Sequence, residues 1–294
     1  MKKHKICKIL LVILAIFLCG AFYELLGICV AYKKQPEVSN TTKKETKNGS
    51  WNECSENTER AVIIEKNPEA LLQRVRLIKN AKKEIILSTF AFQSDESGKL
   101  ILGALHDAAD RGVHIRLLVD GMESWIDMEG NPYFYGLSSH ENVEIKLYNK
   151  ANPLKPWKIM GRMHDKYLIA DGKRYILGGR NTYNYFLGDF PGHKNYDRDV
   201  LVVCDEPEKE NSVNQLLEYF ETIWEQEDSD YFHDNKKLAN RKSVKNAVLE
   251  LQNGYQKYFE ENKERICDTD YTDETFETEK IALVSNPIHT GSKE

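Results

Sequence analysis

Residues 164–181 read HDKYLIADGKRYILGGRN, and this stretch decides the fold of the region around it. Its two apolar runs, at 167–170 and 175–177, have the length of short strands, and the Asp-Gly pair between them is a hairpin signal. Side chains alternate between the two faces of a strand, so His164 and Lys166 are expected to point the same way. The stretch therefore predicts a β-hairpin that presents an imidazole beside an ammonium group.

Small and polar residues complete the hairpin. Gly178 and Gly179 let another group approach the backbone closely, and Asn181 adds a neutral hydrogen-bond donor. Residues 150–198 carry ten Lys and Arg against four Asp and Glu, although the whole chain has a net charge of −5. This basic island favours an anionic substrate, best matched by a phosphate group, with an ordinary solvated surface as the alternative. The overall acidity argues against a long basic groove, so nucleic acid is not expected as a partner.

Strand and helix patterns alternate on the amino-terminal side of the hairpin. Apolar runs at 61–64, 84–92 and 113–120 are separated by amphipathic segments at 67–82 and 97–111. Alternation at these lengths is typical of parallel strands joined by crossover helices. We therefore expect an α/β fold, with a mixed, largely parallel sheet flanked by helices. The remaining predicted elements are strands at 143–148 and 200–204 and helices at 211–225 and 241–265.

The amino terminus has the pattern of a membrane anchor. Residues 1–8 carry four lysines, and residues 9–31 form an apolar run of 23 residues that is broken only by Glu24. At about 1.5 Å per residue this transmembrane helix would cross a hydrocarbon layer of roughly 30 Å. A cleaved signal peptide is the alternative, because residues 9–23 alone fit its shorter apolar region. In both cases we expect the domain on the extracytoplasmic side of the cell membrane, held by a polar tether at 32–60.

The six cysteines give no sign of a metal site. They form no CxxC pair and no cluster with histidine, so neither a metal nor another cofactor is expected. Cys204 ends an apolar run and is predicted to be a buried thiol. A Cys54–Cys267 disulfide is one pairing that the sequence allows.

The spacing H-x-K-x4-D-x6-G-G-x-N within residues 164–181 resembles the signature of the phospholipase D superfamily. Residues 61–225 are most similar to bacterial cardiolipin synthases and related phospholipase D-like proteins. The resemblance implies a phosphodiesterase or phosphatidyl transferase that acts on phospholipids through a phosphohistidine intermediate. His164 is then either the nucleophile or the general acid that protonates the leaving alkoxide. Lys166 would hold the non-bridging oxygens, and Asn181 would donate a hydrogen bond to the same group.

The resemblance also suggests the residues around this core. Asp199, with Asp197 in reserve, matches an acidic position that would fix the tautomer of His164. Asp171 lies an odd number of positions from His164, so a regular strand would aim it at the opposite face, and a structural ion pair is favoured over catalysis. The supporting residues are Asp171, Gly178 and Gly179, and the candidate substrate-binding residues are Arg162, Arg180 and Trp157.

Members of the superfamily combine two such motifs in one site, and this chain has one. His289 is followed by Thr-Gly with no Lys two residues on, so it is not a second copy. Residues 281–294 resemble the start of a second half, after a catalytic domain at 61–230 and a helix with an acidic linker at 231–280. We expect the partner to be either a second copy in a homodimer or a second phospholipase D half, with the chain itself a fragment in the latter case. The alternatives in function are an inactive half that binds lipid or protein, and a nuclease.

Overall fold

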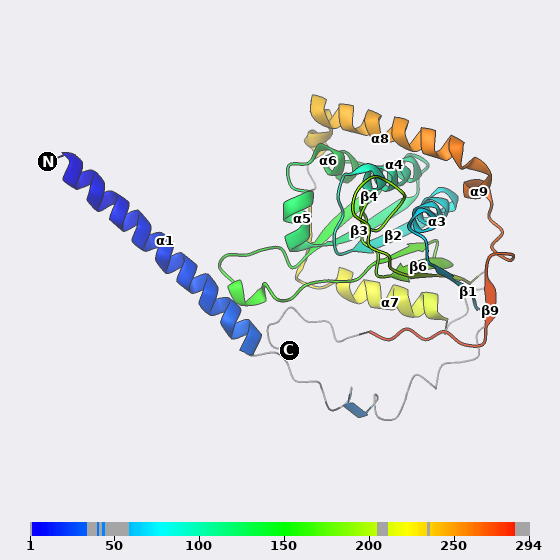
Figure 1. Cartoon of the computed structure of the whole chain (residues 1–294), viewed down its shortest axis with the longest axis horizontal. Coiled ribbons are helices and arrows are strands. Elements are labelled where there is room, and N and C mark those ends of the chain that lie inside the picture. Colours follow the sequence, from blue (N-terminus) through cyan, green and yellow to red (C-terminus); the bar gives the residue numbers. More distant parts are fainter. Residues whose placement is uncertain are drawn as a thin grey trace.

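The structure is a computed structural model that describes residues 2–33, 40, 43–44, 59–204, 211–233 and 236–285. A long helix extends away from a layered α/β domain (Figure 1). The strands are β1 (Glu59–Ile64), β2 (Glu84–Thr89), β3 (His114–Asp120), β4 (Val143–Tyr148), β5 (Tyr167–Ala170), β6 (Arg174–Gly178), β7 (Asp199–Val203), β8 (Ser229–Tyr231) and β9 (Phe276–Thr278). The helices are α1 (Lys2–Lys33), α3 (Asn67–Asn80), α4 (Glu96–Asp110), α5 (Gly121–Asp127), α6 (Pro132–Ser138), α7 (Ser212–Trp224), α8 (Lys242–Glu261) and α9 (Lys263–Cys267), with 3-10 turns η2 (Pro156–Lys158) and η3 (Lys236–Asn240).

One mixed sheet holds all the named strands, in the order β8-β4-β3-β2-β5-β6-β7-β1-β9. The predicted α/β class is therefore confirmed, as is the hairpin formed by β5 and β6. Parallel pairing is limited to β2 with β3 and β3 with β4, and the other six pairings in the described sheet are antiparallel. The expectation that the sheet is largely parallel needs correction on this point. β1 does not join the parallel group because it pairs with β7 and β9, on the far side of the hairpin.

Helices cover both faces of the sheet (Figure 1). The central strands are apolar on both sides, as the unbroken run in β2 indicates. Ile85 and Leu87 belong to the larger core cluster, which also holds α3, α4, α6 and α8 side chains. Ile86, between them, packs in a second cluster under α7. Because side chains alternate along the strand, one face of the sheet packs against the larger cluster and the other face packs against the cluster under α7.

The helix α8 is part of the same domain. Its buried residues recur at helical spacing and face α4 and α6. The helices approach closely at Gly103, where a Cβ would overlap the carbonyl oxygen of Leu251 and the Cβ of Tyr255. The buried face of α8 consists of Val244, Ala247, Leu251, Tyr255 and Phe259.

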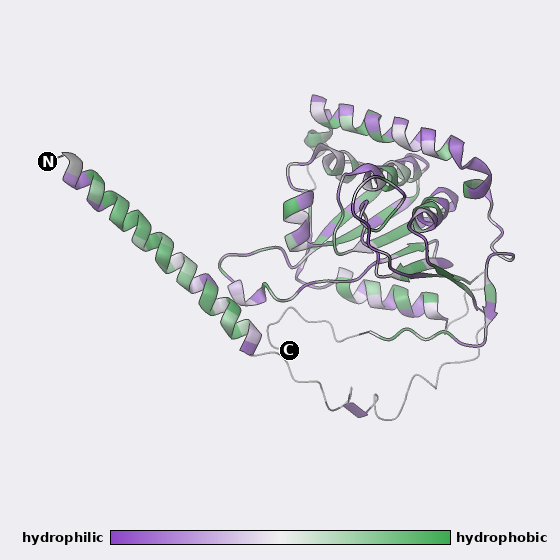
Figure 2. Ribbon diagram, in the orientation of Figure 1, coloured by the Kyte–Doolittle hydropathy of each residue, from purple (hydrophilic) through white to green (hydrophobic). Residues whose placement is uncertain are grey.

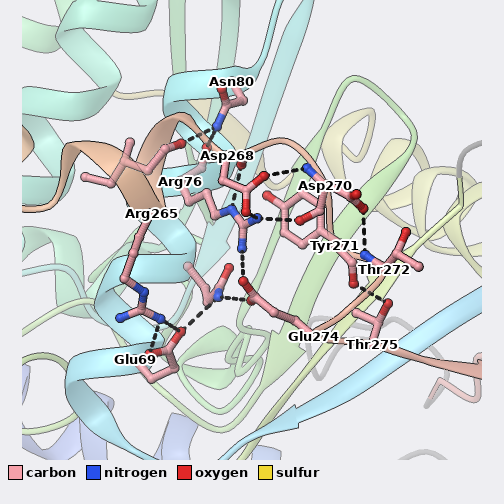
Figure 3. Close-up of polar contacts among 12 residues, drawn as sticks. Glu69, Arg76, Asn80, Arg265, Asp268, Asp270, Tyr271, Thr272, Glu274 and Thr275 are labelled. Carbon is pink, nitrogen blue, oxygen red and sulfur yellow. Dashed lines mark hydrogen bonds and ion pairs between the residues drawn. The ribbon is translucent and has the colours of Figure 1, made fainter.

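The segment after α9 is held to α3 by Arg76 (Figure 3). The Arg76 side chain is almost fully buried and donates to the carbonyl oxygens of Asp268 and Asp270 and to the Glu274 carboxylate, each at 2.8 Å. The guanidinium also lies over the Tyr271 ring, at 3.9 Å from its centroid. The sequence suggested an acidic linker here. The structure instead shows a packed segment whose carboxylates meet an arginine distant in sequence, and whose strand β9 extends the sheet.

Residues 281–285 also differ from the expectation of a new strand. They have no regular secondary structure and run along α7, where the backbone N–H of Leu283 donates to the Gln215 side chain at 2.9 Å. Ile281 and Leu283 pack on the apolar cluster under that helix. The amide of Leu283 thus meets a side chain rather than a neighbouring strand, because α7 occupies this side of the sheet.

The helix α1 exposes its apolar side chains along its length (Figure 2). It is the only helix in the described residues that is long and apolar enough to cross a membrane, over His4–Lys33. Most of the predicted tether at 32–60 lies outside the described residues, and so does Cys54, which leaves the Cys54–Cys267 pairing as a prediction. Cys204 is buried, as predicted.

Candidate active site

The predicted site lies at one end of the central strands, where β2 and β3 end and β5 begins. β2 and β5 are antiparallel, with Ser88 opposite Tyr167, so the residue after β2 meets the residues before β5. His164 and Lys166 therefore precede the strand, and their placement on a regular strand needs correction. The turn of the hairpin is as predicted, with positive φ at Asp171 (54°) and Gly172 (64°).

Asp120, a residue that the sequence argument missed, fixes the segment that carries His164. Its buried carboxylate accepts from the backbone N–H groups of Met122 and Glu123 at the start of α5, and from the N–H of Met163 at 3.1 Å. The Arg162 side chain donates to the same carboxylate at 2.9 Å. Asp120 is the last residue of β3, and a carboxylate at the end of a buried strand was the available signal.

Phe90 is a second residue that sequence reasoning missed. Its ring meets the His164 imidazole edge-on, with 4.6 Å between the ring centroids. The Lys166 Nζ lies 5.3 Å from the same ring centroid and the Arg162 guanidinium carbon lies 4.9 Å from it. The electron-rich ring face thus attracts two cations beside the imidazole. Phe90 directly follows the buried strand β2, and this position was the available signal that its ring lies at the same end of the sheet as His164.

Lys166 is buried, and its side chain makes one hydrogen bond among the described residues, from Nζ to the His164 carbonyl oxygen at 2.6 Å. Burial lowers the pKa of its ammonium to about 8, and the nearby carboxylates of Asp165 and Asp197 oppose this shift. An ammonium group has three donors, so Lys166 retains donor capacity for an anionic ligand. A buried cation with few protein acceptors suits a phosphate oxygen.

His164 is solvent-exposed at the mouth of the site. Partial burial, and then the charge of Lys166, lower the pKa of its imidazole below the usual value. The ring is therefore neutral at pH 7, the form in which one nitrogen carries a lone pair. Within the described part of the chain neither ring nitrogen has a hydrogen-bond partner, so both are accessible to a ligand.

Gly178 ends β6, and Asn181 follows it as a buried residue. The Asn181 side-chain oxygen accepts from the Ala91 N–H at 3.2 Å, which leaves its NH₂ group as the donor end. A Cβ on Gly178 would overlap the Asp199 carboxylate, and one on Gly179 would overlap the Asp197 carboxylate. The groups that approach the backbone at these glycines are therefore two acids of this chain.

Asp199 is not the acid behind His164, and that prediction needs correction. Its carboxylate is buried and binds the guanidinium groups of Arg74 at 2.9 Å and Arg180 at 3.2 Å. The reserve candidate, Asp197, acts on Lys166, where its charge and that of Asp165 oppose the lowered pKa, whereas the carboxylates that raise the pKa of His164 are those of Asp165 and Asp120. Asp199 begins β7, whereas Asp197 lies two residues earlier, outside the strand.

Arg180 is not available for substrate, in contrast to the expectation. Only 1% of the residue is exposed. Besides Asp199, its guanidinium donates to the Asn67 side chain and to the carbonyl oxygens of Ile64, Glu65 and Asp197. Arg180 therefore connects the hairpin to the segment between β1 and α3, and its role is structural.

Asp171 holds the hairpin turn against the start of β2. Its carboxylate accepts from the backbone N–H groups of Lys82, Lys83 and Glu84 at 2.7–3.1 Å. The structural position agrees with the expectation, but its contacts within the described chain are main-chain amides rather than the predicted ion pair. These amides would otherwise be unpaired between α3 and β2.

The other two candidate binding residues lie at the rim. Arg162 is near His164, but its guanidinium is already paired with Asp120 and with Glu123 at 2.9 Å. Trp157 lies on η2, which packs against α1, and is about one-third exposed at 36%. The geometry therefore places Arg162 beside the site and Trp157 beside the amino-terminal helix.

A cavity of about 280 Å³ opens beside His164 and Lys166. Asp165 and Tyr219 line it and are joined by a hydrogen bond of 2.8 Å from the Tyr219 hydroxyl. The segment 283–285 lines another side, so the carboxy-terminal part of the described chain borders the site. No group of three or more His, Cys, Asp or Glu in the described residues is arranged to hold a metal ion.

Comparison with known proteins identifies relatives of this region. A family described as "Cardiolipin synthase, PLD-like domain" matches residues 74–224. An uncharacterized protein from Helicobacter pylori strain J99 is 30% identical over 212 residues, which cover 67% of this chain and 39% of the relative. Cardiolipin synthase C of Escherichia coli K12 is 29% identical over 171 residues, which cover 53% of this chain and 34% of the relative. The match thus spans well under half the length of either relative.

A solved structure supports the architecture. The phosphatidylserine synthase of Haemophilus influenzae superposes with a TM-score of 0.51 at 17% identity. The match covers 75% of this chain and 48% of that enzyme. At this identity the likeness shows the fold alone.

Proposed function

This chain belongs to the family of cardiolipin synthase PLD-like domains, and on that premise we propose that it is a membrane-anchored phosphodiesterase or phosphatidyl transferase acting on phospholipids. The single observation that carries the proposal is the pair formed by His164 and Lys166. A neutral imidazole and an ammonium with unused donors border one open cavity. The imidazole can act as a nucleophile and the ammonium can bind an anion, and the two residues are two positions apart in the sequence.

The proposed reaction has two displacements at phosphorus. A nitrogen of His164 attacks the phosphodiester, the bond to the leaving alkoxide breaks, and that oxygen takes a proton from a general acid. Water or an alcohol then attacks the phosphohistidine, gives up its proton and releases the imidazole. Lys166 and the NH₂ of Asn181 stabilise the charge on the non-bridging oxygens in both steps.

This mechanism requires a second half. One imidazole cannot be the nucleophile and also hold the proton for the leaving group in the same step. A second copy of the chain, or another phospholipase D half, would bring its own histidine to the cavity. In that arrangement His164 is the nucleophile in one half and the general acid in the other, which covers both roles suggested by the sequence.

The substrate assignment rests on the helix α1 together with the family. An apolar helix adjoining the domain would keep the site beside a bilayer, where phospholipid is the abundant phosphodiester. The relatives named as cardiolipin synthases support the same class of substrate. We propose a single-pass anchor with the domain on the extracytoplasmic side; protection of the domain from protease added to intact cells would contradict that side.

The test uses the full chain in nanodiscs that contain phosphatidylglycerol, with the release or transfer of the headgroup as the measurement. His164→Asn is expected to abolish turnover, a loss of several powers of ten, because no covalent intermediate forms. Intact-mass analysis of quenched reactions should detect a phosphatidyl adduct in the unmodified chain and none in this variant. His106→Asn, on α4, is the matched control and should retain full activity. Unchanged turnover in His164→Asn would refute the assignment.

The need for a second half is tested with the same assay. Nanodiscs that carry two copies should be active, and those that carry one copy inactive, if the homodimer is the functional form. Equal activity per chain in both would contradict the shared site. Inactivity in both, with lipid still bound, would favour the inactive binding half.

A further inference from the structure

Large apolar side chains are exposed on the side of the domain next to α1. Three of them are exposed by 65% (Trp125), 66% (Ile126) and 77% (Leu154). Isolated exposed apolar residues are ordinary, but a group of large ones marks an interaction surface. We call this group the docking face; it consists of Met122, Trp125 and Ile126 on α5 and of Leu154, Trp157 and Met160 on the loop around η2.

Two cavities join the parts of this face. Met122 and Pro153 line both a cavity of about 470 Å³ that includes Trp125, and a cavity of about 130 Å³ that includes Pro156. The α5 and η2 segments are therefore neighbours, although about thirty residues separate them. The two cavities thus lie between α5 and the loop that leads to η2.

The docking face is continuous with α1. The Tyr23 hydroxyl donates to the Leu154 carbonyl oxygen at 2.8 Å, and a Cβ on Gly27 would overlap the Pro156 ring. In Figure 2 the apolar length of α1 runs directly to the η2 segment. Tyrosine and tryptophan favour the boundary between lipid and water, and Tyr23 and Trp157 both occur at this junction.

Charge at the same place fits an anionic layer. Four basic residues and one acid, Glu24, border the smaller cavity; the basic residues are Lys150, Lys155, Lys158 and Arg162. Lys158 and Arg162 are neutralised by acids, but Lys155 is exposed and has no acidic partner in the described residues. Lysines near a membrane surface are attracted to anionic lipid.

We propose that the docking face rests in the headgroup layer of an anionic bilayer, beside the point where α1 leaves it. Its apolar side chains enter the upper acyl region, as those of interfacial segments do. Arg162 lies over Phe90, and the Phe90 ring contacts His164. A bilayer in contact with the docking face would therefore hold the active-site cavity at headgroup depth. The inference rests on the proposed anchoring by α1, and the experiment separates the two.

The experiment measures tryptophan quenching by brominated phospholipid in proteoliposomes of the full chain, in a Trp51→Phe background. Trp125 and Trp157 should be quenched, whereas Trp224 is buried in the core and should not be. The variant Trp125→Phe/Trp157→Phe should lose at least four-fifths of the quenchable signal. Into that double variant, Phe17→Trp on α1 introduces a positive control, and Leu249→Trp on the exposed side of α8 a negative one.

The outcomes are distinct. Quenching at position 17 and at Trp125 and Trp157, with none at position 249, supports the proposal. Quenching at position 17 alone overturns the docking face and leaves the anchor intact. No quenching at position 17 means that the anchoring has failed, and the docking face with it. Equal quenching at position 249 would show non-specific adsorption and would also overturn the proposal.

Discussion

Lys166 and Arg180 are two buried cations that flank the same hairpin, one before β5 and one after β6, and they differ in how many acceptors the protein gives them. Arg180 donates to one side-chain oxygen and three carbonyl oxygens, and it pairs with the Asp199 carboxylate. Lys166 donates to a single carbonyl oxygen among the described residues and borders an open cavity.

The difference separates a structural cation from one that can bind ligand. A saturated guanidinium stabilises the fold and has nothing left for a phosphate, whereas an undersatisfied ammonium is costly until an anion arrives. Burial lowers the pKa of both cations, so the number of acceptors, and not the pKa, separates them. The four predictions below test this contrast.

Arg180→Met should have the largest effect, on stability. Removal of the guanidinium leaves Asp199 with one cation, Arg74, and several buried acceptors unpaired, which costs about 3–5 kcal/mol of unfolding free energy. Urea unfolding of the full chain measures it. A loss below about 1 kcal/mol would show that the surrounding acceptors find water or other partners.

Lys166→Met is the matched substitution on the same hairpin, and it should act on turnover. Loss of one preorganised donor to the transferred group typically lowers kcat by about 10²–10³-fold. The unfolding free energy should stay the same or rise, because a desolvated charge is removed. Turnover within tenfold of the unmodified chain would place the phosphate elsewhere.

Asp171→Ala tests whether a polar residue of the motif is structural. It removes the acceptor for three backbone amides at a position with φ of 54°, and it should cost about 0.5–2 kcal/mol by comparison with lost helix caps. Asp171→Asn retains one oxygen and tolerates that φ, so its loss should be smaller. Both folded variants should keep turnover within a few-fold, and a large loss of kcat would give Asp171 a catalytic part.

The pH profile gives the smallest effect. The pKa of Lys166 is lowered to about 8, so its ammonium is present below that pH and is lost as the pH rises through it. If the cation binds the phosphate, kcat/KM should fall above about pH 8. Lys166→Arg keeps its charge in this range, and its residual activity should lack that decline. The same decline in Lys166→Arg would assign it to another group.

The sequence predicted the hairpin well because its signals are local. Alternating apolar runs and an Asp-Gly turn determine β5 and β6 without help from the rest of the chain. It predicted Arg180 and Asp199 poorly because their partners are remote. Asn67 and Ile64 are more than one hundred residues from Arg180, and nothing in the GGRN pattern announces them.

The carboxy-terminal region shows the same limit. Its acidic composition suggested a linker, since composition reports average polarity but not the partner of each carboxylate. Arg76 is almost two hundred residues away from Glu274, and only the packing of α9 on α3 brings them together. Phe90 and Asp120 were missed for a similar reason. Each lies at the end of a neighbouring strand, and only the assembled sheet brings them to the segment that carries His164.

The sequence by itself determined the α/β class, the hairpin, the apolar amino-terminal helix and the residue types of the site. Only the tertiary structure decided which cation is free for an anion, which acid lies near it, and which apolar side chains stay uncovered beside α1. The physical reason is that strand and helix periodicity acts over a few residues. Acceptor counts, burial and exposure depend on contacts between segments that only the folded chain brings together.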